Sequence, residues 1–486
     1  MNSHFFKRSI PPLTALILAG CVSYSGITPH ATIMTSNDLG LRSTGTATAI
    51  QWPNDHAWDV LQDPVLSNLM KQALEQNPTI NVARARLNQV DAMVKAADAD
   101  RLPAVSLNAS STPEHFTENY IYPPPYAGSV YSTNLLMVNA KYEFDFWGKN
   151  GDLIAAAISN EKAAAAELQS AKLLIEASVA KSYFTLARSL EQKKILERTL
   201  AQREELVNLR SELLKAGLDT RQETQISRQG LPAVRADIIR MDEQIGLSRN
   251  ALAALIGKGP DATKDTVATL PATVNSTAPE SVPAELVGRR ADISAARQRV
   301  ESAGKLIDAT KTEFYPNINI SAFAGFSSLG FAHWLNGSSR DYGVGPAISL
   351  PIFDGGRLRA NLSSKTAAYD IAVESYNQTL IEAVHDVADQ LTSLRSLDLQ
   401  RSQQTDLLRN AESVYDIAQQ REKVGLVSHA VVLNAETTLI AQQSAAIDLR
   451  TRAVELNINL VRALGGGFTE PVASEHGKQS ASTNLN

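Results

Sequence analysis

Cysteine is almost absent from this chain of 486 residues, in which Cys21 is the only one. A single cysteine excludes an intrachain disulfide framework and a cysteine-based metal cluster. The sequence also lacks a basic excess: 46 Lys and Arg against 51 Asp and Glu leave a formal net charge of −5. Without a basic tract, no nucleic acid partner is expected. Aromatic residues make up only 6% of the chain, and tracts rich in Ala, Leu, Gln and Ser indicate helix.

The first twenty residues have the order of a bacterial export signal. A basic start at Lys7-Arg8 precedes an apolar run of about ten residues over 10–19, which is too short to span a bilayer. The run ends in Leu18-Ala19-Gly20-Cys21, which resembles the bacterial lipobox, in which the cysteine is acylated and becomes the new N-terminus. We therefore expect residues 1–20 to be a lipoprotein signal peptide and Cys21 to be the lipidation site. Val22, rather than Asp, would be the second residue of the processed chain, and by the enteric sorting convention this favours localisation to the outer membrane. The alternative is an ordinary cysteine after an uncleaved anchor.

Four landmarks recur in the same order about 210 residues apart, which indicates an internal duplication. The pairs are Leu102-Pro103 with Tyr315-Pro316, Phe146-Trp147-Gly148 with Phe353-Asp354-Gly355, Lys215-Ala216-Gly217-Leu218 with Lys423-Val424-Gly425-Leu426, and Ala254-Leu255-Ile256-Gly257 with Arg462-Ala463-Leu464-Gly465. The predicted division is an anchor segment over 21–60, a first repeat over 61–257, a linker over 258–284, a second repeat over 285–465 and a disordered tail over 466–486.

Each repeat is predicted to hold a very long helical hairpin, over about 149–256 and 356–464. The outgoing helices contain no proline, and at 1.5 Å per residue about 65 residues would reach on the order of 100 Å. The second outgoing helix carries apolar residues that step by three and four, which is typical of a coiled-coil seam. These residues are Tyr369, Val373, Tyr376, Leu380, Val384, Val387, Leu391 and Leu394.

Four segments alternate apolar and polar residues with period two, which predicts strands over about 104–111, 133–146, 317–327 and 341–353. Strands of this kind suit half of a soluble sandwich or a membrane barrel, and the export signal favours the barrel. Four strands do not close a barrel, and open sheet edges are not tolerated in lipid. A membrane barrel therefore requires several chains, each contributing four strands.

The motifs do not indicate an enzyme. The histidines are scattered, and the tightest group is His385, Asp386 and Asp389. His385 and Asp389 lie one helical turn apart without a third ligand nearby, which favours a polar helix surface over a metal site. Lys258 lacks a phosphate-binding loop before it, and no nucleophile elbow occurs. We expect no catalytic residue, no metal and no cofactor.

The chain resembles the TolC-like outer membrane factors, specifically the NodT-type efflux lipoproteins. The most specific stretch is Glu285-Leu286-Val287-Gly288-Arg289-Arg290-Ala291-Asp292-Ile293, in which Ala291 stands where the family signature has proline. Leu350-Pro351-Ile352-Phe353-Asp354-Gly355-Gly356 is similar to the family's turn from strand into long helix, and Asp145-Phe146-Trp147-Gly148-Lys149 is its counterpart in the first repeat.

This resemblance implies a mainly α fold with a membrane β-barrel. Three chains would form a homotrimer, with a twelve-strand barrel in the lipid of the outer membrane and a twelve-helix tunnel in the periplasm. The linker over 258–284 would lie in the equatorial region of the tunnel. The implied function is a passive exit duct of a tripartite efflux system for drugs, toxic organics or metal ions.

The implied partners are a periplasmic adaptor, also called a membrane fusion protein, and an inner-membrane efflux pump. Gly217, Leu218, Gly425 and Leu426 at the hairpin tips would dock the adaptor. Asp219, repeated three times around an axis, is a candidate entrance gate, and helix capping is the structural alternative for it. The other function considered is a lipid-anchored coiled-coil protein, structural or adhesive, without a channel.

Overall fold

The computed structural model describes residues 23–35, 37–41, 58, 63–272, 282 and 288–469. Cys21, the predicted signal peptide and most of the predicted tail lie outside the described residues. The chain divides into two compact units. The sheet unit contains residues 23–33, 87–164 and 296–376, and the hairpin unit contains the rest of the described chain.

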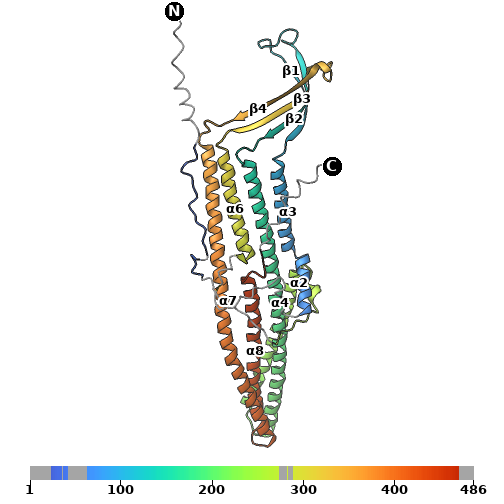
Figure 1. The fold of residues 1–486 in the computed structure, drawn as a ribbon. Coiled ribbons are helices and arrows are strands. Elements are labelled where there is room, and N and C mark those ends of the chain that lie inside the picture. The colour runs from blue at the N-terminus through green and yellow to red at the C-terminus, as the bar shows by residue number, and fades with distance from the viewer. Residues whose placement is uncertain are drawn as a thin grey trace, which may run out of the picture. The chain divides into compact units, whose positions relative to one another are not determined.

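Helices dominate the described residues, together with one small antiparallel sheet, which confirms that part of the predicted fold class. The elements of Figure 1 are α2 (Pro64–Gln76), α3 (Pro78–Ala99), β1 (Ala104–His115), β2 (Val130–Glu143), α4 (Lys149–Lys215), α5 (Arg221–Leu255), η2 (Pro260–Thr263), α6 (Ala291–Thr312), β3 (Asn317–Leu329), η4 (Gly337–Ser339), β4 (Arg340–Ser349), α7 (Arg357–Lys423) and α8 (His429–Ala463). The order helix, two strands, long helix, shorter helix occurs twice. Helices α4 and α7 have 67 residues each, and α5 and α8 have 35 each.

In the described parts of the chain, no helix combines enough length with enough apolar character to cross a membrane.

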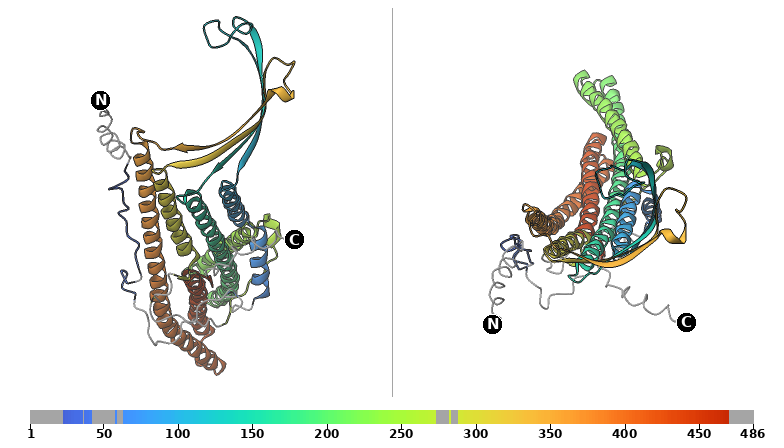
Figure 2. Two further views of the ribbon diagram at one scale, coloured as in Figure 1. Left: turned by 45° about the horizontal axis from the view of Figure 1, so that its top comes forward. Right: turned by 90° about the horizontal axis from the view of Figure 1, so that it is seen from above.

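The sheet has the strand order β1-β2-β3-β4, with every neighbouring pair antiparallel. The strands bend together along their length (Figure 2). The central pair joins the two halves of the chain, because β2 precedes α4 whereas β3 follows α6. Its register sets Val138 opposite Ala324 and Tyr142 opposite Ile320. Within the described sheet, β1 and β4 each have one strand partner, so each leaves one edge unpaired.

The alternation separates the two faces of the sheet. One face is apolar and open to solvent in the single chain, as Val105 at 68% and Ile348 at 70% exposure show. Other exposed members of this face are Leu107, Val138, Ile320, Tyr342 and Val344. The opposite face is largely polar or small, with Ser106, Asn108, Asn139, Ser321 and Gly345. An exposed apolar surface of this extent marks contact with another chain or with lipid.

Two strands end earlier than the alternation predicts. Strand β4 ends at Ser349 rather than at 353, because Pro351 has no N–H to donate to a ladder. Strand β2 ends at Glu143 rather than at 146. The Phe146 N–H there turns back to the Phe144 carbonyl at 2.9 Å. Asp145 then accepts the Gly151 N–H at 3.0 Å, so the end of the strand leads directly into α4.

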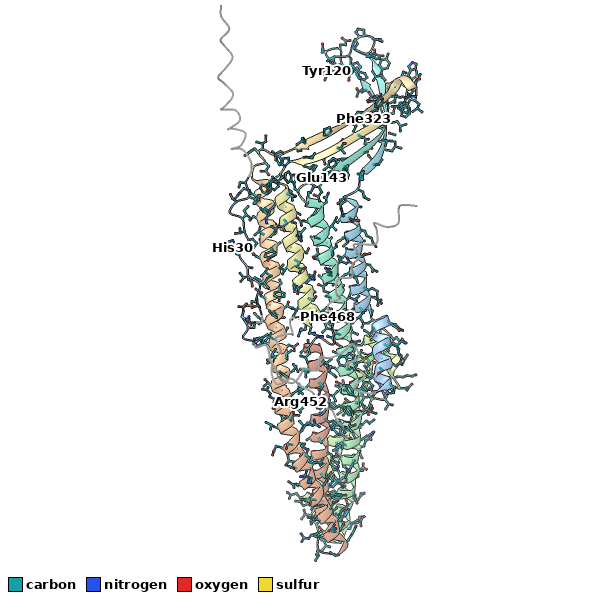
Figure 3. All side chains as sticks on the ribbon, viewed as in Figure 1. His30, Tyr120, Glu143, Phe323, Arg452 and Phe468 are labelled. Atoms are coloured by element: carbon teal, nitrogen blue, oxygen red, sulfur yellow. The ribbon has the colours of Figure 1, made fainter. Side chains whose placement is uncertain are left out.

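In the sheet unit, residues 23–31 lie along α7. One carboxylate oxygen of Asp370 accepts the backbone N–H groups of His30 and Ala31, each at 3.0 Å. Arg359 donates to the carbonyls of Ser23 and Ser25. Figure 3 shows His30 beside α7. The segment that begins two residues after Cys21 is thereby tied to one helix by its backbone.

The hairpin unit has an apolar centre built around α4. Tyr183 and Phe184 are each 1% exposed and pack in one cluster with Leu252 of α5 and Val454 of α8. The Tyr183 hydroxyl donates to Asp63 at 2.5 Å, and burial together with this bond raises the pKa of Tyr183. The other Asp63 oxygen caps α2 by accepting the first N–H groups of that helix. One carboxylate therefore starts α2 and satisfies a buried phenol.

Candidate functional site

The two hairpin tips have the same backbone structure. Gly217 and Gly425 adopt φ values of +73° and +75°, in the left-handed region that glycine occupies without strain. The Leu218 N–H donates to the Leu213 carbonyl, and the Leu426 N–H donates to the Arg421 carbonyl, each at 2.8 Å. Together with the glycine N–H bonds to the residues three positions earlier, this is the Schellman ending of a helix. The shared Lys-x-Gly-Leu motif therefore makes the same rigid turn twice.

Each turn presents an apolar side chain to solvent. Leu218 is 75% exposed and Leu426 is 68% exposed. At the end of such a turn, the leucine side chain finds few apolar groups of its own chain to pack against. Rigid turns with exposed apolar side chains are suited to binding another protein.

Asp219 makes its contacts inside its own hairpin. Its carboxylate accepts the Thr220 N–H at 2.7 Å and the Arg210 guanidinium at 3.1 Å. These two partners, the backbone N–H first, lower the pKa of Asp219. The N-cap of α5 is Thr220, whose hydroxyl accepts the Glu223 N–H, so the structural alternative in which Asp219 caps this helix is wrong. The reason is that Asp219 lies one residue too early and is drawn to Arg210.

A series of polar contacts joins residues 188–205 of α4 to α8, and sequence reasoning missed it. Gln192 and Gln202 are 7% and 4% exposed, and they donate to backbone carbonyls of α8 at Ser444 and Leu433. Ion pairs flank these buried amides: Arg188–Asp448, Glu191–Arg450, Arg198–Glu436 and Glu205–His429. The α4 members are spaced by three, four or seven residues and so share one face of the helix, and this spacing was the available signal.

His429 forms the contact of this series closest to the second turn. Its Nδ1 lies 2.5 Å from Glu422 Oε1, and its Nε2 lies 2.8 Å from Glu205 Oε1. The hydrogen bond with Glu205, followed by the contacts with Glu422, raises the pKa of His429 although partial burial opposes the shift. Protonated His429 donates to both carboxylates and so connects α4, α7 and α8.

The Arg290 of the signature stretch is a structural residue. Its guanidinium forms two bonds with Asp292, at 3.0 and 2.7 Å, and donates to the Ala463 carbonyl at 3.0 Å. Asp386 lies 3.5 Å away and binds Arg462 through both oxygens at 2.9 Å. Asp386, considered above as a metal-group member, is thus engaged with arginines. In the described residues, no three His, Cys, Asp or Glu side chains gather as a metal-binding group.

Comparison with known proteins assigns the family. A family model described as outer membrane efflux protein matches residues 69–258 and 282–466. The chain belongs to the outer membrane efflux protein family. It is 28% identical over 446 residues to the multidrug resistance outer membrane protein MdtP of Escherichia coli strain K12, covering 90% of each chain. It is 33% identical over 361 residues to the fusaric acid resistance protein FusA of Burkholderia cepacia, covering 73% of this chain and 68% of FusA.

Solved structures agree with this family assignment. The outer membrane protein VceC of Vibrio cholerae is 35% identical, with a TM-score of 0.78 over 86% of this chain and 100% of VceC. The outer membrane channel CmeC of Campylobacter jejuni, 21% identical, shares the fold with a TM-score of 0.82 over 92% of this chain and 96% of CmeC. The predicted resemblance to the TolC-like outer membrane factors is confirmed.

The His429 contact predicts a pH-dependent tip. Because its pKa is raised in the folded state above the ordinary 6.5, its stabilising effect is complete below that value and is lost as pH rises through the folded pKa. We expect His429→Ala to speed hydrogen exchange of the tip amides about two- to fivefold at pH 6, the range of a partly exposed ion pair. At pH 9 the variant and the wild type should exchange alike. His429→Gln, which keeps hydrogen-bonding groups but no charge, is the control, and a variant effect that is equal at both pH values would contradict the prediction.

Proposed function

We propose that this protein is the outer membrane channel subunit of a tripartite efflux system and works as a homotrimer. The carrying observation is the sheet: one face is apolar and exposed, and β1 and β4 each have an unpaired edge. Pairing β4 of one copy with β1 of the next satisfies both edges and removes them from lipid. Three copies give twelve strands, which lies within the range of membrane barrels. The repeats over 61–257 and 285–465 each supply two strands and one helical hairpin to this assembly.

In this proposal the helical hairpins of three chains form a twelve-helix periplasmic tunnel. The channel itself is a passive duct without a catalytic step or cofactor, and the energy comes from an inner-membrane pump. A periplasmic adaptor connects pump and tunnel. The names of MdtP and FusA, which refer to multidrug and fusaric acid resistance, support drugs and toxic organics as the exported class. Metal ions are the further cargo class that the resemblance implies.

Cys21 belongs to the same proposal as the acylated N-terminus. The contacts of residues 23–31 with Arg359 and Asp370 support it, because they hold the start of the proposed mature chain at the beginning of α7, shortly after the strands that are proposed to enter the membrane. Several acyl chains contribute about 0.8 kcal/mol per buried CH₂ and anchor the chain firmly in one leaflet.

Electron microscopy of the detergent-extracted protein tests the assembly. The expected particle is hollow and three-fold, and mass spectrometry of the same sample should find Cys21 acylated at the N-terminus. A monomer, or a solid rod without a lumen, would refute the channel and favour a lipid-anchored coiled-coil protein. An unmodified Cys21 would remove the anchor and leave the channel proposal standing.

The tips are proposed to dock the adaptor through Leu218 and Leu426, positioned by Gly217 and Gly425. Leu218→Glu together with Leu426→Glu should abolish drug resistance in a strain that depends on this channel, because charge at both turns opposes apolar docking. Trimer yield should not change, since both side chains are exposed in the single chain. The paired Leu→Met variant is the control and should remain resistant. Full resistance of the glutamate variant would rule out docking through these leucines.

Asp219 is proposed as part of the periplasmic entrance, where three copies would bring three carboxylates around one axis. Asp219→Asn keeps the shape of the side chain and a hydrogen-bond acceptor for Arg210 but removes the charge. We expect this variant to lose cation preference in planar-bilayer reversal potentials. Asp261→Asn, which changes an aspartate at η2 far from the turn in sequence, is the control for net charge. Equal reversal potentials of the Asp219 variant and the wild type would exclude the gate role.

A further inference from the structure

Several apolar side chains interrupt the polar face of the sheet, and two of them, Phe323 and Met137, lie opposite glycines of the neighbouring strand. Phe323 stands two residues after Ser321 on β3, and Met137 stands two residues before Asn139 on β2, so both share the polar face. Phe323 is 39% exposed and Met137 is 7% exposed. Figure 3 marks Phe323 on the sheet. In the proposed barrel this face lines the bore, and each large residue would occur three times at one level.

Each of these side chains lies over a glycine of the neighbouring strand. The register pairs Phe323 with Gly343 and Met137 with Gly325. A Cβ atom added at Gly343 would lie 2.8 Å from both Cε1 and Cζ of the Phe323 ring. A Cβ atom at Gly325 would lie 2.8 Å from the sulfur of Met137 and 2.0 Å from the Leu136 carbonyl oxygen. These distances are too short for any side chain, so the ring and the thioether occupy space that only glycine leaves open.

The glycine at 345 shows that this arrangement is local. Gly345 lies on the same strand and the same face, two residues from Gly343, and a Cβ atom added there would meet nothing within 4 Å. Side chains on a strand ordinarily stand roughly perpendicular to the sheet. A phenylalanine on the inner wall of a barrel would therefore project into the bore, unless a small residue on the neighbouring strand leaves room for the ring to lie parallel to the sheet.

We propose that Gly343 holds the ring of Phe323 flat against the inner wall and thereby sets the width of the bore at this level. Gly325 does the same for Met137. The inference rests on the proposed trimeric barrel, in which the polar face is the inner one. According to this proposal, two glycines and two apolar residues determine, by steric exclusion, which solutes can pass this level of the channel.

A reporter cysteine below this level makes the width measurable. Ala347 lies on β4, on the polar face and exposed, beyond Gly343 and Gly345 in the direction of α7. A bulky, membrane-impermeant fluorescent maleimide added to intact cells must pass Phe323 to reach Ala347→Cys. The chain without the reporter is the blank, because Cys21 is its only other cysteine.

The matched pair is Gly343→Ala and Gly345→Ala in the reporter background. Both variants add one methyl group to the same face of the same strand, but only the first meets the ring. We expect Gly343→Ala to slow labelling of the reporter, Gly345→Ala to leave the rate unchanged, and Gly343→Ala with Phe323→Ala to restore it. Phe323→Ala alone should speed labelling, and this result remains informative if Gly343→Ala does not assemble.

The outcomes separate the two proposals. Equal labelling rates in the two alanine variants, or no change in Phe323→Ala, would overturn the role of Gly343 and leave the channel intact. A reporter that is never labelled in an assembled trimer, in any background, would show that the polar face does not line an open bore. That result would refute the barrel proposal together with this inference.

Discussion

The pairing of β2 with β3 is the constraint on which the sheet unit depends. These strands come from different halves of the chain, and their eleven-residue register brings two separate hairpins into one sheet. The result is a sheet that a single chain leaves incomplete, because one face is apolar and exposed and the outer edges of β1 and β4 lack partners. A backbone edge in lipid costs several kcal/mol per unsatisfied group, and closing the sheet as proposed above removes this cost. In the proposed trimer, oligomerisation therefore follows from unpaired hydrogen-bonding groups rather than from any single side-chain contact.

Much of the fold could be predicted because local patterns determine it. The alternation along Asn317–Leu329 reports a sheet with two different faces, and the three- and four-residue steps around Leu380 and Val387 report a helix buried along one side, where both residues are 0% exposed. The tip turns were likewise readable from Gly217 and Gly425, since a glycine after a long helical pattern ends it in a known way. Strand ends were less predictable, because they depend on Pro351 and on the turn at Phe144.

The contacts that sequence reasoning missed are those between distant segments. Gln192 and Gln202 look like solvated helix residues until α8 is placed beside α4, and nothing local marks Asp370 as the acceptor for the N–H groups of His30 and Ala31. Arg290 belongs to a recognisable sequence motif, but the motif does not reveal its structural role. That role depends on contacts with the Ala463 carbonyl and Asp386, which are remote in sequence. A sequence shows which residues are polar, but only the tertiary structure shows which groups they contact.

The equal lengths of α4 and α7, and of α5 and α8, restrict the insertions and deletions that this chain can accept. An insertion of one residue in α4 ahead of Gln192 would rotate the rest of that helix by about 100° about its axis. Gln192, Gln202 and Glu205 would then turn away from α8 together, and two buried amides would lose their carbonyl acceptors. Tolerated changes of length in this region are therefore expected in whole helical repeats and in both hairpins at once. Helices α4 and α7 both have 67 residues, and α5 and α8 both have 35. A duplicated gene keeps these lengths matched only if both copies change by the same number of residues.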